Sequence, residues 1–233
     1  MNNIAKSKAR IKKSLEKGFL YHHLALERSE KFLKKHDSER LPMFVLYVDL
    51  VGSTKMSSDL NPDSLNVIIR TFSQEMSYVI ESFGGYVLKF IGDAVLAYFP
   101  DNTKNNQTEE IMNCSEIMNK IVNKAINPIL ERERLPKLQI KISVDYGDCS
   151  IVRYGANKNR SHIDLIGLTL NLAAKMQNYA KPNQTIIGET VFKRLNTKTK
   201  KMFKKKQTDS KSWIFHQLKI KTPYSIYYRV SNS

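Results

Sequence analysis

Two aspartates occupy positions that suit metal ligands better than surface carboxylates. Asp49 follows the apolar run 43–48, and Asp93 closes the stretch 89–93 just before a second apolar run, 94–99. Each carboxylate therefore lies where a buried strand is predicted to meet a turn. Carboxylate oxygens are hard ligands that suit Mg²⁺ or Mn²⁺, and two such ions ~3.5–4 Å apart serve an in-line phosphoryl displacement. If the two strands are neighbours, the aspartates converge on one metal site.

Two further segments could contact a phosphorylated ligand. Gly52, Ser53 and Thr54 follow Asp49 in a predicted tight turn, whose backbone N–H groups can receive phosphate oxygens. Residues 164–175 pass from an extended stretch into a helix, on which Asn171 and Lys175 lie four residues apart and project from one face. Each motif alone is weak, because an aspartate before a turn is more often a cap and most helices have a polar side.

The elements that must position these residues follow from apolar periodicity and from turn residues. Their order of strand, helix, strand, strand, helix, strand is ferredoxin-like. This predicts an α+β fold with a mixed or mostly antiparallel sheet and helices on one face. It also places the end of the first strand beside the turn of the hairpin. The expected strands are 44–48, 86–90, 94–99, 138–144 (broken at Gly147), 149–152, 185–187, 213–218 and 225–230, and the expected helices are 4–36, 62–83, 111–125, 169–180 and one from Glu189.

The net charge of +16 is concentrated at two flanks. Residues 1–40 carry 11 basic and 5 acidic side chains, and residues 193–221 carry 11 basic and 1 acidic. Such flanks suit a polyanion, and nucleic acid, an anionic membrane and a nucleoside triphosphate all fit. The run Lys198–Lys206 has a single aromatic residue, Phe203, and no pattern of aromatic residues alternating with the basic ones, so we expect a solvated basic face and no nucleic-acid partner.

The cysteines and the N-terminus point to a cytoplasmic location. Cys114 and Cys149 are far apart and have no metal-ligand spacing, which indicates neither a zinc site nor a disulfide framework. The N-terminus lacks the apolar stretch of a signal peptide, and no run is long enough to span a membrane. Residues 1–40 are interpreted as a basic amphipathic helix and linker. That helix either packs on a partner or on the domain body, or extends into solvent.

Taken together, these segments resemble the class III nucleotidyl cyclases. The resemblance covers residues from about 43 to 230, and four motifs occur in the family's order and spacing. It implies that residues 41–233 form a nucleotide cyclase catalytic domain with two Mg²⁺ or Mn²⁺ ions per site. The matching stretches are 47–54, 89–93, 140–147 and 164–175.

The resemblance also implies a role for each matching position. Metal ligation falls to the two aspartates and to the backbone carbonyl of Leu50. Asn171 positions the ribose, and Lys175 contacts the α-phosphate. The remaining implied roles are base reading by Lys89 and Asp164, and terminal-phosphate binding by Lys219.

Base choice follows from donor and acceptor chemistry. In adenylate-specific members of the family, lysine donates to a ring nitrogen and aspartate accepts from the exocyclic amine, which matches Lys89 and Asp164. Four positions depart from the family pattern. Lys175 replaces an arginine and loses its planar fork, Phe90 replaces a threonine, Ile166 replaces an aromatic residue, and Ile220 replaces the glycine after Lys219.

The resulting functional prediction is an adenylate cyclase that converts ATP to 3′,5′-cyclic AMP and pyrophosphate. A pyrimidine nucleotide cyclase of the anti-phage signalling type, making cyclic UMP or cyclic CMP, stays open because two of these departures, Phe90 and Ile166, flank the expected base pocket. An alternative of another class is a non-catalytic basic module that binds nucleotide or nucleic acid. In the family, one subunit supplies the metal pair and the other supplies the base, ribose and phosphate contacts, which predicts a homodimer with its sites at the interface.

Overall fold

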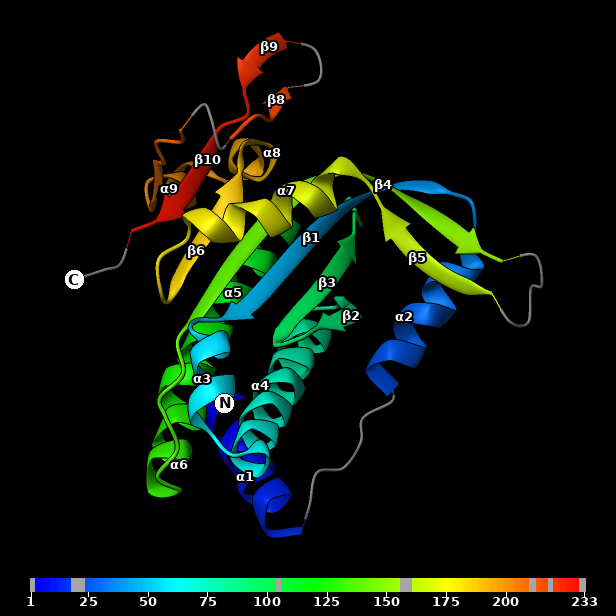
Figure 1. Cartoon of the computed structure of the whole chain (residues 1–233). Coiled ribbons are helices and arrows are strands. Elements are labelled where there is room, and N and C mark those ends of the chain that lie inside the picture. Colours follow the sequence, from blue (N-terminus) through cyan, green and yellow to red (C-terminus); the bar gives the residue numbers. More distant parts are fainter. Residues whose placement is uncertain are drawn as a thin grey trace.

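A mixed sheet organises the chain (Figure 1). The computed structural model describes residues 3–17, 24–103, 106–155, 161–209, 213–217 and 220–230. Within these residues the main sheet has 8 strands in the order β2-β3-β1-β4-β6-β10-β7, with β5 paired to β4, and β8 and β9 form a separate pair. The strands are β1 (Arg40–Leu50), β2 (Tyr86–Ile91), β3 (Ala94–Pro100), β4 (Ile140–Tyr154), β5 (His162–Ile166), β6 (Gln184–Gly188), β7 (Phe203–Lys205), β8 (His216–Gln217), β9 (Ile220–Pro223) and β10 (Ile226–Arg229).

Helices pack on both faces of the sheet. The first core lies between the sheet and α4 and α5, and it receives Phe44, Leu46 and Val48 of β1. The second core lies on the opposite face beneath α2 and α7, and it receives Met43 and Val45. This alternation follows from the two-residue period of a strand. The helices are α1 (Asn3–Lys17), α2 (Leu24–Lys35), α3 (Ser53–Asp59), α4 (Pro62–Ser82), α5 (Gln107–Ile121), α6 (Asn127–Arg132), α7 (Leu168–Met176), α8 (Glu189–Arg194) and α9 (Thr197–Lys200), with a π turn at Val122–Ile126 and a 3-10 turn at Gln177–Tyr179.

The predicted α+β class with a mixed sheet is confirmed, including the helix that begins at Pro62. Asn61 caps that helix by accepting a hydrogen bond from the Ser64 N–H at 2.8 Å. The expectation that helices would cover one face of the sheet was wrong, because α4 and α5 pack on one face and α2 and α7 pack on the other. One strand boundary was also wrong. Gly147 does not break the strand, and β4 is continuous from Ile140 to Tyr154. The glycine is needed for close packing instead, because a Cβ there would lie 2.6 Å from the Thr169 hydroxyl.

The expected single helix at 4–36 is two helices that dock on opposite layers, and residues 18–23 between them lie outside the described part of the chain. α1 packs on the helical layer of α4, α5 and α6, whereas α2 packs on β2 and β5 (Figure 1). The apolar stripe predicted one long seam because it is continuous in sequence. In the fold its two halves fill different cores, with Ile11 in the first and Leu33 in the second.

The Lys198–Lys206 run lies at an edge of the sheet. Its first part forms α9, and its last part enters β7, the terminal strand of the main sheet. Lys204 and Lys205 are exposed there. Charged lysines on an edge strand discourage pairing with a second chain, which gives these two lysines a structural role.

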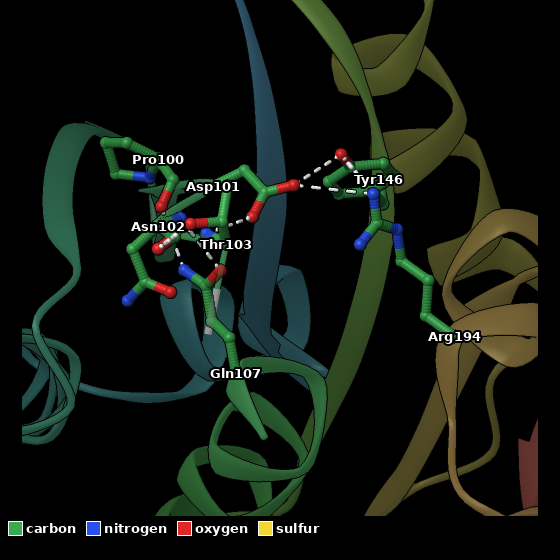
Figure 2. A network of polar contacts seen from close by, with 7 residues as sticks. All are labelled: Pro100, Asp101, Asn102, Thr103, Gln107, Tyr146 and Arg194. Atoms are coloured by element: carbon green, nitrogen blue, oxygen red, sulfur yellow. Dashed lines mark hydrogen bonds and ion pairs between the residues drawn. The ribbon is translucent and has the colours of Figure 1, made fainter. Parts of the chain in front are cut away.

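Near the first residues of β1, a network of polar contacts joins the residue that follows β3 to β4 and α8 (Figure 2). The Tyr146 hydroxyl donates to Asp101 at 2.6 Å, and Arg194 donates to the same carboxylate at 3.3 Å while lying 3.7 Å over the Tyr146 ring. Burial alone would raise the pKa of Asp101. The hydrogen bonds from Tyr146 and from the Thr103 N–H, together with the Arg194 charge, hold that pKa below its ordinary value.

A buried carboxylate ties β4 to the C-terminal segment. Asp145 is 1% exposed and accepts hydrogen bonds from the hydroxyls of Thr190 at 2.9 Å and Tyr224 at 2.5 Å. Burial raises the pKa of Asp145 to about 7, although these hydrogen bonds act in the opposite direction. The unfolded carboxyl ionises near its ordinary pKa of 3.8. The native state therefore binds more protons between these two pH values, and stability falls as pH rises through this window.

We expect Asp145→Asn to be more stable than the wild type at pH 8 by roughly 2–4 kcal/mol, because the amide cannot ionise. The difference should vanish near pH 4, where both side chains are neutral. Urea denaturation at a series of pH values would measure it. An equal difference at pH 4 and pH 8 would show that Asp145 does not titrate in this window.

Candidate active site

The two candidate metal ligands meet at one edge of the sheet. β1 pairs with β3 as far as Val48 opposite Val95, so Asp49 lies beside the hairpin that joins β2 to β3. That hairpin has a two-residue turn, Gly92-Asp93, between the paired residues Ile91 and Ala94. Gly92 has a φ of 60°, which suits a glycine at the first turn position of a tight hairpin. The predicted convergence of the two aspartates is therefore present in the fold.

The electrostatics of this pair favour a bound cation. Burial and then the neighbouring Asp93 carboxylate raise the pKa of Asp49 to about 6, against weaker opposing effects of a hydrogen bond from the Leu50 N–H and of the Lys141 charge. Burial, followed by the same two carboxylates, also raises the pKa of the Tyr47 phenol. One oxygen of Asp93, Oδ2, is buried and has no hydrogen-bond partner in the structure. A buried unpartnered carboxylate oxygen is costly, and a divalent cation would satisfy it.

The donor set fits Mg²⁺ or Mn²⁺ but is incomplete in the described chain. Among the residues that the structure describes, no group of three or more His, Cys, Asp or Glu side chains is arranged so that it could hold a metal ion. Hard cations of this kind keep waters and take substrate phosphates as ligands. Two aspartates can therefore be enough carboxylates from the protein, if water and substrate oxygens complete the coordination shell of the cation. The carbonyl of Leu50, the last residue of β1, stays a predicted ligand.

The predicted phosphate turn is partly helical. Gly52 has a φ of 75° and precedes α3, whose first turn contains Ser53 and Thr54. The first N–H groups of a helix have no intrahelical acceptor. The backbone donors that the sequence placed in a turn are thus present at a helix start, directly after the strand that carries Asp49.

A β-bulge determines which way Lys89 points. Val87 lies opposite Ala97, which packs in the first core, but the register then shifts, and Lys89 lies opposite Leu96, which packs in the second core. Leu88 is the extra residue. Without it, strand alternation would turn Lys89 toward the first core. The bulge therefore directs Lys89 to the sheet face that α2 and α7 cover.

Lys89 forms an ion pair there with Asp164 of β5. The Lys89 side chain is 39% exposed and that of Asp164 is 16% exposed. The other carboxylate oxygen of Asp164 accepts the backbone N–H of Leu165 at 2.9 Å. The two predicted base-reading residues are thus brought together within one chain, and a base would exchange with their mutual ion pair.

α7 presents the predicted ribose and α-phosphate groups on its outer side. Asn171 and Lys175 are exposed, whereas Leu172, Ala173 and Met176 are buried. Within the described ranges no hydrogen bond or ion pair joins Asn171 or Lys175 to the two aspartates. Lys219, the predicted terminal-phosphate residue, lies outside the described residues.

Sequence reasoning missed two residues that support the site. Gln177, immediately after α7, donates to the Tyr47 carbonyl at 2.8 Å and to the Ser143 hydroxyl at 3.1 Å, which fixes the end of α7 across β1 and β4. Nothing in the sequence indicates that role, because it depends on the packing of α7. Tyr47 could have been found, because it is two residues from Asp49 and therefore shares its sheet face.

The fold and the site define a nucleotide cyclase domain. Residues 37–224 match the family model described as the adenylate and guanylate cyclase catalytic domain, and the chain belongs to that family. It is 30% identical over 156 residues to a cytidylate cyclase of Staphylococcus aureus, covering 65% of this chain and 37% of that protein. It is 29% identical over 161 residues to a uridylate cyclase of Rhodovulum sp. (strain MB263), covering 65% and 64%.

Solved cyclases share the fold. The crystal structure of the adenylyl cyclase CyaB from P. aeruginosa superposes with a TM-score of 0.68 at 22% identity, covering 84% of this chain and 96% of that one. The match to the S. aureus enzyme spans little more than a third of that protein's length. Among the described helices, none combines the length and the apolar character needed to cross a bilayer. The predicted class III family is confirmed.

Proposed function

We propose that this chain is a nucleotide cyclase that converts a nucleoside triphosphate to a 3′,5′-cyclic nucleotide and pyrophosphate. The observation that carries the proposal is the convergence of Asp49 and Asp93, with a buried and unpartnered oxygen on Asp93. The family supports the same reaction class. Mg²⁺ or Mn²⁺ bound at this pair would lower the pKa of the ribose 3′-hydroxyl and stabilise charge at the α-phosphate.

The protein groups would supply position and charge. Lys175 would neutralise the α-phosphate as a point charge, and Asn171 would orient the ribose so that its 3′-oxygen faces the phosphorus in line. The N–H groups after Gly52 would receive phosphate oxygens. Orientation of this kind accounts for a large part of the reduction in the activation barrier of phosphoryl transfer. Lys219 is retained as a proposed contact of the terminal phosphates.

The base pocket suits a base that carries an exocyclic amine beside an unprotonated ring nitrogen. Lysine can only donate and aspartate can only accept. Adenine and cytosine both present an amine donor beside a ring-nitrogen acceptor, whereas guanine and uracil have a carbonyl beside an N–H in these places. The pair of Lys89 and Asp164 therefore fits ATP and CTP equally. We propose CTP as the substrate, because the S. aureus relative is a cytidylate cyclase, and ATP as the second candidate.

A homodimer would bring the two halves of each site together. Four exposed apolar side chains lie within four residues of Lys89 or Asp164 in the sequence: Phe90 (41% exposed), Ile91 (44%), Ile166 (45%) and Leu168 (38%). Grouped apolar exposure next to a site indicates a contact surface. In the proposed dimer, the two aspartates of one subunit face α7 and the ion pair of Lys89 and Asp164 in the other subunit. We keep a cytoplasmic location as a prediction, because Cys114 and Cys149 are buried and unpaired.

The deciding experiment incubates the purified chain with ATP, CTP, GTP and UTP separately in the presence of Mn²⁺. Mass spectrometry would identify the cyclic products, and light scattering would confirm the dimer. We expect cyclic CMP as the main product and cyclic AMP as the second. Asp93→Asn serves as the inactive control. A confirmed dimer that makes no cyclic nucleotide from any of the four substrates would refute the proposal.

Metal affinity should depend on pH through Asp49. The proton on a carboxyl whose pKa is raised to about 6 competes with the metal. We therefore expect Mn²⁺ binding to weaken roughly tenfold per pH unit below 6 and to level off above 7. Electron paramagnetic resonance of free Mn²⁺ would measure this. In Asp49→Asn the binding should be weak at every pH, and a wild-type affinity that stays constant from pH 5 to 8 would contradict the argument.

A further inference from the structure

The face of the sheet that carries Lys89 is held by an N-terminal helix. Tyr86, three residues before Lys89 on β2, is enclosed by two side chains of α2. The Arg28 guanidinium lies 4.5 Å over the Tyr86 ring, and the Phe32 ring centroid is 4.9 Å away. On the sheet side, Tyr98 stacks on Tyr86 at 5.2 Å and 12°. The ring of Tyr86 is therefore clamped between α2 and β3.

Further contacts fix α2 in this position. The Ser29 hydroxyl, on a residue 2% exposed, donates to the Tyr98 hydroxyl at 3.1 Å. Just past the end of α2, Asp37 accepts a hydrogen bond from Arg153 of β4 at 2.6 Å. Arg153 lies opposite Ile163, the residue before Asp164. The helix therefore contacts β2, which carries Lys89, and the turn after it contacts β4, the strand that pairs with β5 and Asp164.

We propose that α2 is a positioning element for the base-reading pair: by clamping Tyr86 it holds the bulge at Leu88 and keeps Lys89 directed at Asp164. The proposal rests on the proposed function for its enzymatic consequence and on geometry alone for its structural one. A bulge leaves one residue without a ladder partner, so β2 depends on side-chain packing at this point. α2 supplies that packing through Arg28 and Phe32.

The N-terminal segment contains its own control. α1 docks on the helical layer at the other face of the sheet through Arg10, which lies 4.1 Å over the Tyr78 ring and pairs with Glu75 of α4. A variant of Arg10 loosens the N-terminal segment without touching the second core. Replacing Arg28 or Phe32 should therefore release Lys89 from its position beside Asp164, and replacing Arg10 should not.

The test measures reductive methylation of lysine amines in the full chain by mass spectrometry, which requires no catalytic turnover. The proteins are the wild type, Arg28→Ala, Phe32→Ala and Arg10→Ala, with Asp164→Asn marking full release of Lys89. Lys175 is the internal reference because it is exposed and has no partner among the described residues. Arg28 is exposed, so its replacement should not prevent folding, and Phe32→Leu keeps an apolar contact at the second position.

We expect Lys89 to be modified roughly two- to fivefold faster in Arg28→Ala and Phe32→Ala, the factor for losing a partly exposed ion pair. The rate should be restored toward wild type in Phe32→Leu and unchanged in Arg10→Ala. An unchanged Lys89 rate in both α2 variants, or an equal rise in Arg10→Ala, would overturn the proposal. In cyclase assays the α2 variants should raise KM and reduce discrimination among bases more than they reduce kcat. If the wild type has no cyclase activity, the proposed function is wrong. The methylation rates still decide whether α2 positions Lys89, because they require no turnover.

Discussion

Replacing either Asp49 or Asp93 by alanine should lower kcat by at least about 10³-fold, because each change removes one of the two carboxylates proposed to hold the cation. Neither change should destabilise the fold. The pKa of Asp49 is raised to about 6 by burial and by the neighbouring carboxylate, so removing one charge relieves repulsion. Thermal unfolding of Asp93→Asn should therefore occur at or above the wild-type temperature. Loss of activity together with loss of folding would indicate a structural role instead.

Mixed dimers separate a shared site from a site within one chain. In the proposed arrangement, Asp49→Ala removes the metal half and Asn171→Ala removes the ribose contact, so each homodimer should be inactive. Chains carrying the two changes and different affinity tags can be co-expressed and the heterodimer isolated. One of its two sites is intact, so we expect about half the wild-type activity per dimer. An inactive heterodimer, confirmed by both tags, would contradict the shared site.

The meeting of Asp49 and Asp93 could be predicted from the sequence because local signals determine it. The alternation of β1, the two-residue turn at Gly92-Asp93 and the ferredoxin-like element order are each readable from residue types. Together they place the end of β1 beside the hairpin, as the register of β1 with β3 shows. The roles of these aspartates as metal ligands stay predictions that the experiments above test.

The orientation of Lys89 could not be derived from residue periodicity. The stretch 86–91 has no glycine or proline to mark the bulge at Leu88, and the shift appears only in the pairing of β2 with β3. Gly147 shows the opposite error. Its residue type indicated a break, but the position requires a small residue because Thr169 packs against it. In both cases tertiary contact outweighs a local signal.

The N-terminal segment shows how burial of charge identifies a docked helix. Amphipathic spacing left open whether this segment packs on the body or extends into solvent. Glu75 of α4 is 1% exposed and needs a partner, and among the described residues its partners come from a segment distant in sequence. Arg10 donates to it through Nε at 3.0 Å and Nη2 at 2.5 Å, and the Ser7 hydroxyl donates at 2.5 Å. α1 therefore belongs to the folded body.

Removal of Arg10 should destabilise the fold far more than the loss of an exposed ion pair would. Arg10→Leu leaves the Glu75 carboxylate buried with Ser7 as its remaining donor, and we expect unfolding to become easier by about 2–3 kcal/mol. This is below the value for a fully buried pair because the Arg10 side chain is 30% exposed. Urea denaturation would measure the loss. The exposed Glu30–Lys34 pair provides the control, and Glu30→Leu should change stability by less than about 0.5 kcal/mol.

The double variant Arg10→Leu/Glu75→Leu tests the cause of that loss. If the cost arises from an unpaired buried charge, removing the charge as well should restore stability to within about 1 kcal/mol of the wild type, because an apolar pair of similar volume replaces the ion pair. If the guanidinium contact with Tyr78 dominates, the double variant should stay as unstable as Arg10→Leu. Restoration would mean that the ion pair specifies where α1 docks, while apolar packing in the first core supplies the energy that holds it there.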